Sequence, residues 1–232
     1  MIIEGADILG ATFSVGASGT VTSGLTMWLD ANNTASYPGT GTTWFDISGN
    51  SANVTLVNNP TFTAGSPKYF TFASASSQSA TGSTTNVLPQ TSYTKSMWFY
   101  LNSYADNNII SSETGGHFMY MAGSNKLYSG HTNWPNYAAY PSTASLSLNS
   151  WYYAALTFNT TDGMVLYING TQDSTYTADK SAHSGDGSVN VGRFGVGNFI
   201  NGRVAESYCY NRSLTSAEIL QNFNSSKSKY GF

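Results

Sequence analysis

The segment from residue 151 to residue 170 constrains the fold more than any other part of the chain. It reads WYYAALTFNTTDGMVLYING, which is two apolar, aromatic-rich runs separated by a polar turn that ends in Asp162-Gly163. Apolar runs of this length around a polar turn with Asp-Gly are typical of a β-hairpin, and Asn169-Gly170 predicts a further tight turn after it. The segment therefore predicts two antiparallel strands of a sheet.

Similar short runs recur along most of the chain. They are rich in β-branched and aromatic residues, and clusters of Gly, Pro and Asn separate them. No long segment has a 3.6-residue period, apart from one short stretch near the C-terminus. Many short strands between turn clusters predict an all-β fold, a sandwich of two antiparallel sheets. The runs are 25–29, 44–46, 54–57, 69–72, 96–101, 108–111, 118–121, 126–129, 151–158, 165–168, 188–191 and 203–210.

The clearest helix signal follows the strand expected at 203–210. Thr215 and Glu218 have the spacing of a capping box, in which the two residues satisfy each other's backbone N–H groups. We expect one short C-terminal helix to begin there, tied to the sheet by Arg212 and Glu218. The tail, 225–232, either packs its aromatic residues back on the sheet or is exposed.

Charged residues are rare in this chain. Asp, Glu, Lys and Arg make up 9% of the 232 residues and the formal net charge is −3, against roughly 25% charged residues in ordinary soluble proteins. The nine Lys and Arg residues are scattered singly, so no nucleic-acid binding is expected. No run approaches the roughly 18 apolar residues of a membrane helix, so no membrane insertion is expected. The start of the chain lacks the pattern of a signal peptide.

The N-terminal residues differ in composition from the rest. Residues 1–22 are rich in Gly, Ala and Ser, alternate apolar with small residues and carry almost no charge. They predict an N-terminal β arm or hairpin that contacts other subunits, with a floppy leader as the alternative. Residues 23–232 are then one domain. Its single cysteine, Cys209, lies in an apolar strand and is expected to be a small buried hydrophobe.

Five motifs occur in a fixed order between residues 24 and 224. They are Gly24-Leu25-x-x-Trp28-Leu29-Asp30-Ala31, Trp44-x-Asp46-x-Ser48-Gly49-Asn50, the 151–170 hairpin, Val191-Gly192-Arg193, and the series Gly202, Val204, Glu206, Tyr210-Asn211-Arg212, Leu214-Thr215 and Glu218-Ile219. In these motifs the chain resembles the laminin-G-like, concanavalin A-like lectin/glucanase jelly rolls. The resemblance implies two stacked, curved antiparallel sheets, with Trp151 and Tyr167 facing the sandwich interior or bridging the sheets. It also implies a role in holding a surface or a glycan.

Enzyme activity is not expected. A retaining glycosidase on such a scaffold needs two carboxylates roughly 5 Å apart, and Glu-x-Asp-x-Glu on one strand would supply them. No two acids of this chain have that spacing on a strand. His117, His131 and His183 lie far apart in the sequence, and each is expected to be a surface or partly buried polar residue. Hydrolysis by acids that converge from separate loops is the lesser alternative.

The resemblance makes calcium the one candidate cofactor, although none is required. Many relatives bind it at the rim of the sandwich through carboxylate, amide and backbone oxygens. The matching side chains are Asp46 and Asn50, with Asp30 and Glu206 as further candidates. The acidic loop of relatives is replaced by residues 73–78, ASASSQ, which carry no carboxylate. Alternatively, Asp46 and Asn50 cap turns.

Residues 128–140 are the most suggestive binding segment. Sugars bind through aromatic rings that stack on their C–H faces and through amide side chains that meet their hydroxyl groups, and we expect a loop here that offers both. The alternative is that the aromatic rings cover the end of the sandwich or pack on a neighbouring subunit. The candidate residues are His131, Asn133, Trp134, Asn136, Tyr137 and Tyr140.

Two functional hypotheses follow. The first is a non-catalytic structural and adhesive module on a virion surface, a phage capsid decoration or fibre component that resembles stand-alone chains of phage structural genes. It implies a homo-oligomer whose partners are other virion proteins or cell-surface glycans. The second is a lectin domain that binds carbohydrate, free or at a cell surface, in an extracellular location. A glycoside hydrolase is the least favoured reading.

Overall fold

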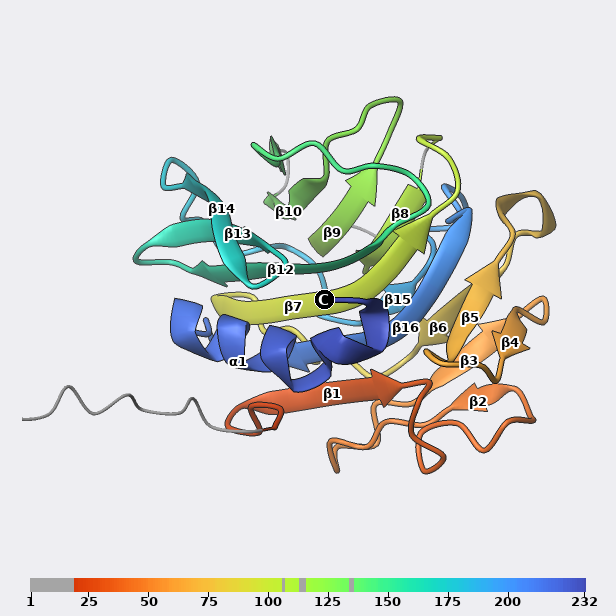
Figure 1. The fold of residues 1–232 in the computed structure, drawn as a ribbon. Coiled ribbons are helices and arrows are strands. Elements are labelled where there is room, and N and C mark those ends of the chain that lie inside the picture. Colours follow the sequence, from red (N-terminus) through yellow and green to blue (C-terminus); the bar gives the residue numbers. More distant parts are fainter. Residues whose placement is uncertain (1–18, 106, 113–115, 134–135) are drawn as a thin grey trace, which may run out of the picture.

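Two antiparallel sheets face each other in the computed structural model, which describes residues 19–105, 107–112, 116–133 and 136–232 (Figure 1). In the described chain each sheet has eight strands. Sheet A runs in the order β14 (Thr171–Tyr176), β13 (Gly163–Ile168), β12 (Trp151–Asn159), β7 (Ser92–Leu101), β16 (Gly202–Tyr210), β5 (Tyr69–Phe72) and β4 (Thr61–Thr63), and β1 (Leu25–Asp30) also pairs with β16. Sheet B runs in the order β11 (Asn136–Pro141), β10 (Tyr128–Asn133), β9 (Gly116–Met121), β8 (Asn107–Ser111), β15 (Asn190–Val191), β6 (Ser79–Gly82), β3 (Val54–Val57) and β2 (Thr43–Trp44). The predicted two-sheet jelly-roll fold is confirmed.

The main core lies between the two sheets. Strand side chains alternate between faces, and in β12 the even-numbered Ala154, Leu156 and Phe158 belong to this inner cluster. The odd-numbered Tyr153 and Ala155 belong to a second cluster on the other face of sheet A. Full burial of one large apolar side chain contributes roughly 1.5–3 kcal/mol, so the strict alternation fixes which face of each strand points inward.

The second cluster is covered by the C-terminal helix α1 (Ser216–Ser226) and the short 3-10 helix η2 (Lys227–Tyr230); a further 3-10 turn, η1, spans Ser74–Ser76. Figure 1 shows α1 lying against sheet A, between β7 and β1 in this view. The predicted capping box of Thr215 and Glu218 is confirmed. The expected ion pair to Arg212 is also present, with Arg212 Nη2 2.6 Å from Glu218 Oε1. Of the two alternatives for the tail, the structure has Tyr230 buried and stacked on Trp98, with ring centroids 4.0 Å apart.

Two predictions about side-chain direction or local structure are wrong. Trp151 and Tyr167 do not lie between the sheets but belong to the cluster on the outer face of sheet A. Their neighbours Tyr152 and Leu166 pack in the main core instead, as the two-residue period of a strand requires. The segment 128–140 is a β-hairpin of β10 and β11 rather than a loop.

The beginning of the described chain docks on the helix. The Val21 amide donates to Asn222 Oδ1 at 2.8 Å, and Gln221 Nε2 donates to the carbonyl of Gly19 at 3.0 Å. Most of the expected arm, residues 1–18, lies outside the described residues. The prediction for Cys209 is confirmed, since it is a fully buried free thiol. None of the described helices is long and apolar enough to span a membrane.

Candidate functional site

A β-bulge in β16 directs an arginine and a glutamate to the same face of sheet A. Along β16, Val204 pairs with Phe99 and Glu206 pairs with the next residue, Trp98, so Ala205 is an extra residue. Without the bulge, residues three apart on a strand would point to opposite faces. Because of it, both Arg203 and Glu206 lie on the outer face, which also carries α1.

Two aromatic side chains contact Arg203, and a third contacts both of those rings. Its guanidinium lies 5.0 Å from the ring centroid of Tyr69 and 4.3 Å from that of Tyr100. The Trp151 ring centroid is 5.6 Å from that of Tyr69 and 5.7 Å from that of Tyr100. All four side chains are partly exposed. We call these four residues the aromatic platform.

The platform stands on rigid elements. Its residues come from β12, β7, β16 and β5, which are consecutive strands of sheet A. Trp151 pairs with Tyr100, and Tyr100 pairs with Arg203 in the sheet register. Side chains on regular strands hold their positions better than side chains on loops. The platform is therefore a prearranged aromatic and cationic surface.

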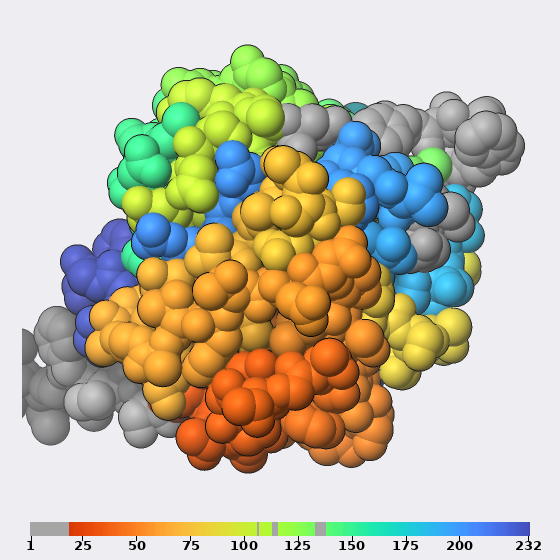
Figure 2. Space-filling model, turned by 90° about the vertical axis from the view of Figure 1, so that its right-hand side faces the viewer, coloured from red at the N-terminus to blue at the C-terminus, as the bar shows by residue number. Residues whose placement is uncertain are grey.

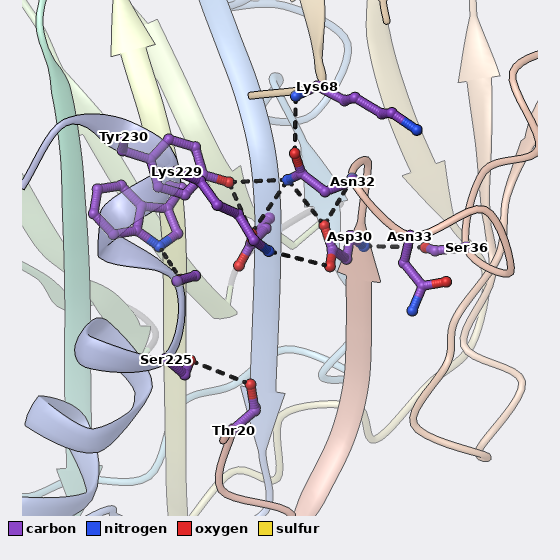
Figure 3. A network of polar contacts seen from close by, with 12 residues as sticks. Thr20, Asp30, Asn32, Asn33, Ser36, Lys68, Ser225, Lys229 and Tyr230 are labelled. Atoms are coloured by element: carbon purple, nitrogen blue, oxygen red, sulfur yellow. Dashed lines mark hydrogen bonds and ion pairs between the residues drawn. The ribbon is translucent and has the colours of Figure 1, made fainter. Parts of the chain in front are cut away.

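Tyr230 borders the platform, with its ring centroid 5.1 Å from that of Trp151. Figure 3 shows the polar network that holds this ring in place. The Tyr230 hydroxyl donates to Glu206 Oε1 at 2.8 Å, and Lys229 Nζ donates to the same oxygen at 2.8 Å. Asn32 Nδ2 bridges Glu206 Oε1 and Asp30 Oδ1, at 3.3 and 3.1 Å. The buried Glu206 carboxylate thus anchors the C-terminal segment to sheet A.

Burial and charge together set the proton affinities in this network. Burial raises the pKa of Asp30, and the nearby Glu206 carboxylate raises it further. Burial and then the Glu206 carboxylate raise the pKa of both Tyr208 and Tyr230, so both phenols stay protonated donors. Burial lowers the pKa of Lys229, but its contacts with Glu206 outweigh this effect and the net shift is upward. Lys229 therefore stays charged beside the two acids.

Two of the four calcium candidates meet in this network. Asp30 and Glu206 are cross-strand partners of β1 and β16. The cation beside them is the Lys229 ammonium, 3.8 Å from Asp30 Oδ2 and 2.8 Å from Glu206 Oε1. Within the described ranges, no group of three or more His, Cys, Asp or Glu residues is arranged to hold a metal ion. The two carboxylates are occupied by protein donors.

The other two calcium candidates lie in the loop between β2 and β3. Asp46 Oδ1 accepts hydrogen bonds from the amides of Trp28 and Ser48, at 2.8 and 2.9 Å. Asn50 Nδ2 donates to the carbonyl of Leu25 at 3.0 Å. These contacts agree with the turn-capping alternative. Calcium binding stays a prediction.

The glycan candidates of the 128–140 hairpin are only partly described. Trp134 lies outside the described residues, as do the side chains of Asn133, Asn136 and Tyr137. Tyr140 is partly exposed and stacks on Tyr176 of β14, with ring centroids 4.3 Å apart. His131 is fully buried, with its Nδ1 3.1 Å from the Tyr93 hydroxyl. The structure brings Tyr140 to the surface and His131 into the sandwich.

The three histidines do not lie apart in space, contrary to expectation. The ring centroid of His183 lies 6.3 Å from that of His117 and 6.0 Å from that of His131, and all three side chains are buried. Fully buried Lys95 donates from Nζ to the carbonyl of Phe118 at 2.5 Å. Burial lowers the pKa of Lys95 and of all three histidines, to about 3 for His131. This cluster is part of the interior between the sheets.

A pocket of ≈ 430 Å³ lies on sheet B. Hydroxyl groups dominate its lining, together with one carboxylate and one guanidinium; the residues are Thr55, Thr81, Gly82, Ser83, Ser188, Asp186 and Arg193. Figure 2 shows this end of the molecule, where the orange and amber residues of β3 to β6 adjoin the blue segment near β15. None of the described residues that line the pocket is aromatic, so they provide no stacking surface. The aromatic platform is the stronger candidate site.

The platform was not predicted from the sequence. The family resemblance implied that Trp151 faces the sandwich interior or bridges the sheets, and no sequence pattern indicated a role for Tyr69, Tyr100 or Arg203. The signal available was the alternation of each strand, which puts Tyr100 and Trp151 on the face opposite the core. The bulge in β16 gave no recognisable signal, and without it Arg203 and Glu206 fall on opposite faces.

Comparisons with known proteins agree with the fold. A family model described as the concanavalin A-like lectin/glucanases superfamily matches residues 73–220, more than half of the chain. A comparison with curated protein sequences gave no match.

Three similar solved structures cover most of this chain. The binding domain of paraclostridial mosquitocidal protein 1 has a TM-score of 0.71 at 16% identity, covering 88% of this chain and 52% of that one. The binding domain of botulinum neurotoxin DC in complex with SialylT has a TM-score of 0.68 at 19% identity, with 88% and 52% covered. Trypanosoma rangeli sialidase has a TM-score of 0.62 at 15% identity, with 92% and 34% covered. The chain thus spans about half of the toxin domains and a third of the sialidase, and the likeness concerns the fold.

Proposed function

Because the chain belongs to the concanavalin A-like lectin/glucanases superfamily, we propose that it is a non-catalytic carbohydrate-binding module whose ligand lies on the aromatic platform. The observation that carries this proposal is the partly exposed group of Trp151, Tyr100 and Tyr69 around Arg203. Aromatic rings offer a flat apolar surface with little conformational entropy to lose on binding. The C–H faces of a sugar ring match such a surface.

The contacts around the platform support binding rather than turnover. Glu206 is fully buried, and its oxygens accept hydrogen bonds from Tyr208, Tyr230 and Lys229. A retaining glycosidase needs an acid and a nucleophile that reach the scissile bond. Asp30 and Glu206 instead hold the C-terminal segment in place. Screening for hydrolysis of β-glucans and sulfated polysaccharides tests whether the module only binds carbohydrate. Hydrolysis by the wild type that disappears in Glu206→Gln would show that it is an enzyme.

A glycan array on the full chain tests the site. Trp151→Ala removes the largest stacking surface, and we expect the signal to fall at least tenfold, which corresponds to about 1.4 kcal/mol. Phe45→Ala is the matched control, because Phe45 is a 41% exposed aromatic residue outside the platform. Tyr140→Ala probes the hairpin proposed from sequence. Loss of binding in Tyr140→Ala with full binding in Trp151→Ala would move the site to the hairpin.

We further propose that the module is displayed on a virion surface as a decoration or fibre component, in a homo-oligomer. The low content of charged residues, 9%, and the N-terminal segment, whose only charged residues are Glu4 and Asp7, support an adhesive surface protein of this kind. Its partners would be other virion proteins and cell-surface glycans. Mass spectrometry and immunogold labelling of purified particles test the location, and sedimentation of the chain with and without residues 1–18 tests the assembly. A monomer in both forms, absent from particles, would favour the extracellular lectin alternative.

A further inference from the structure

We propose that the platform recognises a sugar that carries a carboxylate group, and that Arg203 binds this carboxylate. The inference rests on the proposed function, because it names the ligand class of the same site. It concerns specificity: Trp151 would provide stacking for any sugar ring, whereas Arg203 would select the acidic ones.

The donors of Arg203 have no protein partner. In the part of the chain that the structure describes, its side chain contacts the rings of Tyr69 and Tyr100 and makes no hydrogen bond or ion pair. Arg212 shows the usual alternative, since its two terminal nitrogens bind Glu218 at 3.0 and 2.6 Å. A guanidinium carries five N–H donors. Those of Arg203 remain available to a ligand.

The surroundings of Arg203 suit an anion. Its guanidinium is partly buried and lies close to two aromatic rings, which restrict its motion and shield it from part of the solvent. A charge-assisted hydrogen bond is stronger in such a place than in bulk water. The planar guanidinium matches a planar carboxylate through two parallel hydrogen bonds, a geometry that lysine cannot provide.

The acids on the same face do not compete for Arg203. Asp30 and Glu206 are bound by Lys229 at 3.8 and 2.8 Å. Asn32 donates to the other oxygen of Asp30, and Tyr208 donates to the other oxygen of Glu206. Arg203 is therefore a cation beside a stacking surface whose nearby carboxylates already have partners. A ligand that combines an apolar ring face with a carboxylate fits both features at once.

Isothermal titration of the full chain tests the inference with three probes: a sialylated or uronate-containing oligosaccharide, its carboxylate methyl ester and its neutral counterpart. The wild type should bind the acid at least tenfold more tightly than the ester or the neutral sugar, and rising salt should weaken binding of the acid. Arg203→Gln should abolish the preference for the acid over its ester and its neutral counterpart. Arg203→Lys should keep only part of the preference for the acidic sugar. Lys180→Gln, which removes an exposed charge elsewhere, should bind like the wild type.

The outcomes separate the inference from the proposed function. Equal affinity for acid and ester, or an acid preference that survives in Arg203→Gln, overturns the inference and leaves carbohydrate binding intact. A sulfated sugar preferred over the carboxylated one also overturns the carboxylate assignment. Failure to bind any sugar overturns both, as does binding of an acidic peptide in place of sugars. Circular dichroism of each variant confirms that the fold is retained.

Discussion

The guanidinium of Arg203 lies 4.3 Å from the ring centroid of Tyr100, its cross-strand partner in β7. A cation on an aromatic face gains about 0.5–1 kcal/mol at an exposed site. More importantly, the contact restricts a long side chain that would otherwise lose rotamer freedom on binding. Tyr100 therefore holds the Arg203 side chain in place before a ligand binds.

This relationship predicts the effect of changes at Tyr100. Tyr100→Phe keeps the aromatic face and should bind the acidic glycan like the wild type. Tyr100→Leu removes the face, and the affinity for the acidic glycan should fall about three- to tenfold, by the loss of about 1 kcal/mol. Titration calorimetry measures both. Equal affinities in Tyr100→Leu and the wild type would show that the ring does not prepare the arginine.

The hydroxyl of Tyr230 should contribute to the free energy of unfolding through its hydrogen bond to Glu206. Tyr230→Phe removes a donor from the buried Glu206 carboxylate, and a hydrogen bond to a charged group contributes about 1.5–3 kcal/mol. Urea denaturation should show a loss of this size. Tyr104→Phe is the control, because the Tyr104 hydroxyl donates to the neutral carbonyl of Leu146 at 2.9 Å, and it should lose about 0.5–1.5 kcal/mol. A smaller loss in Tyr230→Phe than in Tyr104→Phe would mean that the network does not anchor the C-terminal segment.

The buried histidines predict sensitivity to acid. Burial lowers the pKa of His117, His131 and His183 below the value of about 6.5 in an unfolded chain. Nearby Lys95 lowers all three pKa values further, whereas Asp186 raises that of His183 without reversing the shift. Between pH 6.5 and the lower folded values, the unfolded state binds more protons. The stability that the three histidines contribute should therefore be fully present above pH 6.5 and fall on acidification, by about 1.4 kcal/mol per pH unit for each histidine.

Thermal unfolding between pH 4 and pH 8 measures this dependence. His131→Asn should reduce the slope of stability against pH by the contribution of one histidine, because the pKa of His131 falls to about 3 in the folded protein. Stability that is constant down to pH 4.5, or a slope unchanged in His131→Asn, would contradict the buried neutral state of the cluster.

Much of the fold could be predicted from local patterns. The hairpin of β12 and β13 and the capping box of Thr215 and Glu218 depend on neighbours in the sequence, and both are confirmed. The strands that were missed lack such patterns. β14, with the sequence TQDSTY, is an edge strand that is largely exposed, so no apolar alternation marks it.

The sites were harder to predict because they depend on pairing across the sheets. His117 and His131 are cross-strand partners in β9 and β10, although 14 positions separate them in the sequence. The platform depends on the extra residue Ala205 in β16, which redirects Arg203 relative to Glu206. Neither pairing register nor a bulge can be deduced from composition or spacing. Lys95 could not be predicted for the same reason, since nothing in its strand predicts a buried lysine.

The most direct test of the binding site follows the indole N–H signals of the five tryptophans by two-dimensional NMR during titration with a glycan selected on the array. Trp151→Phe and Trp134→Phe assign the two signals that matter. The signal of Trp151 in the platform should shift and saturate with the ligand, while that of Trp134 in the 128–140 hairpin stays in place. A saturating shift of Trp134 with Trp151 unchanged would place the sugar on the hairpin and contradict the account.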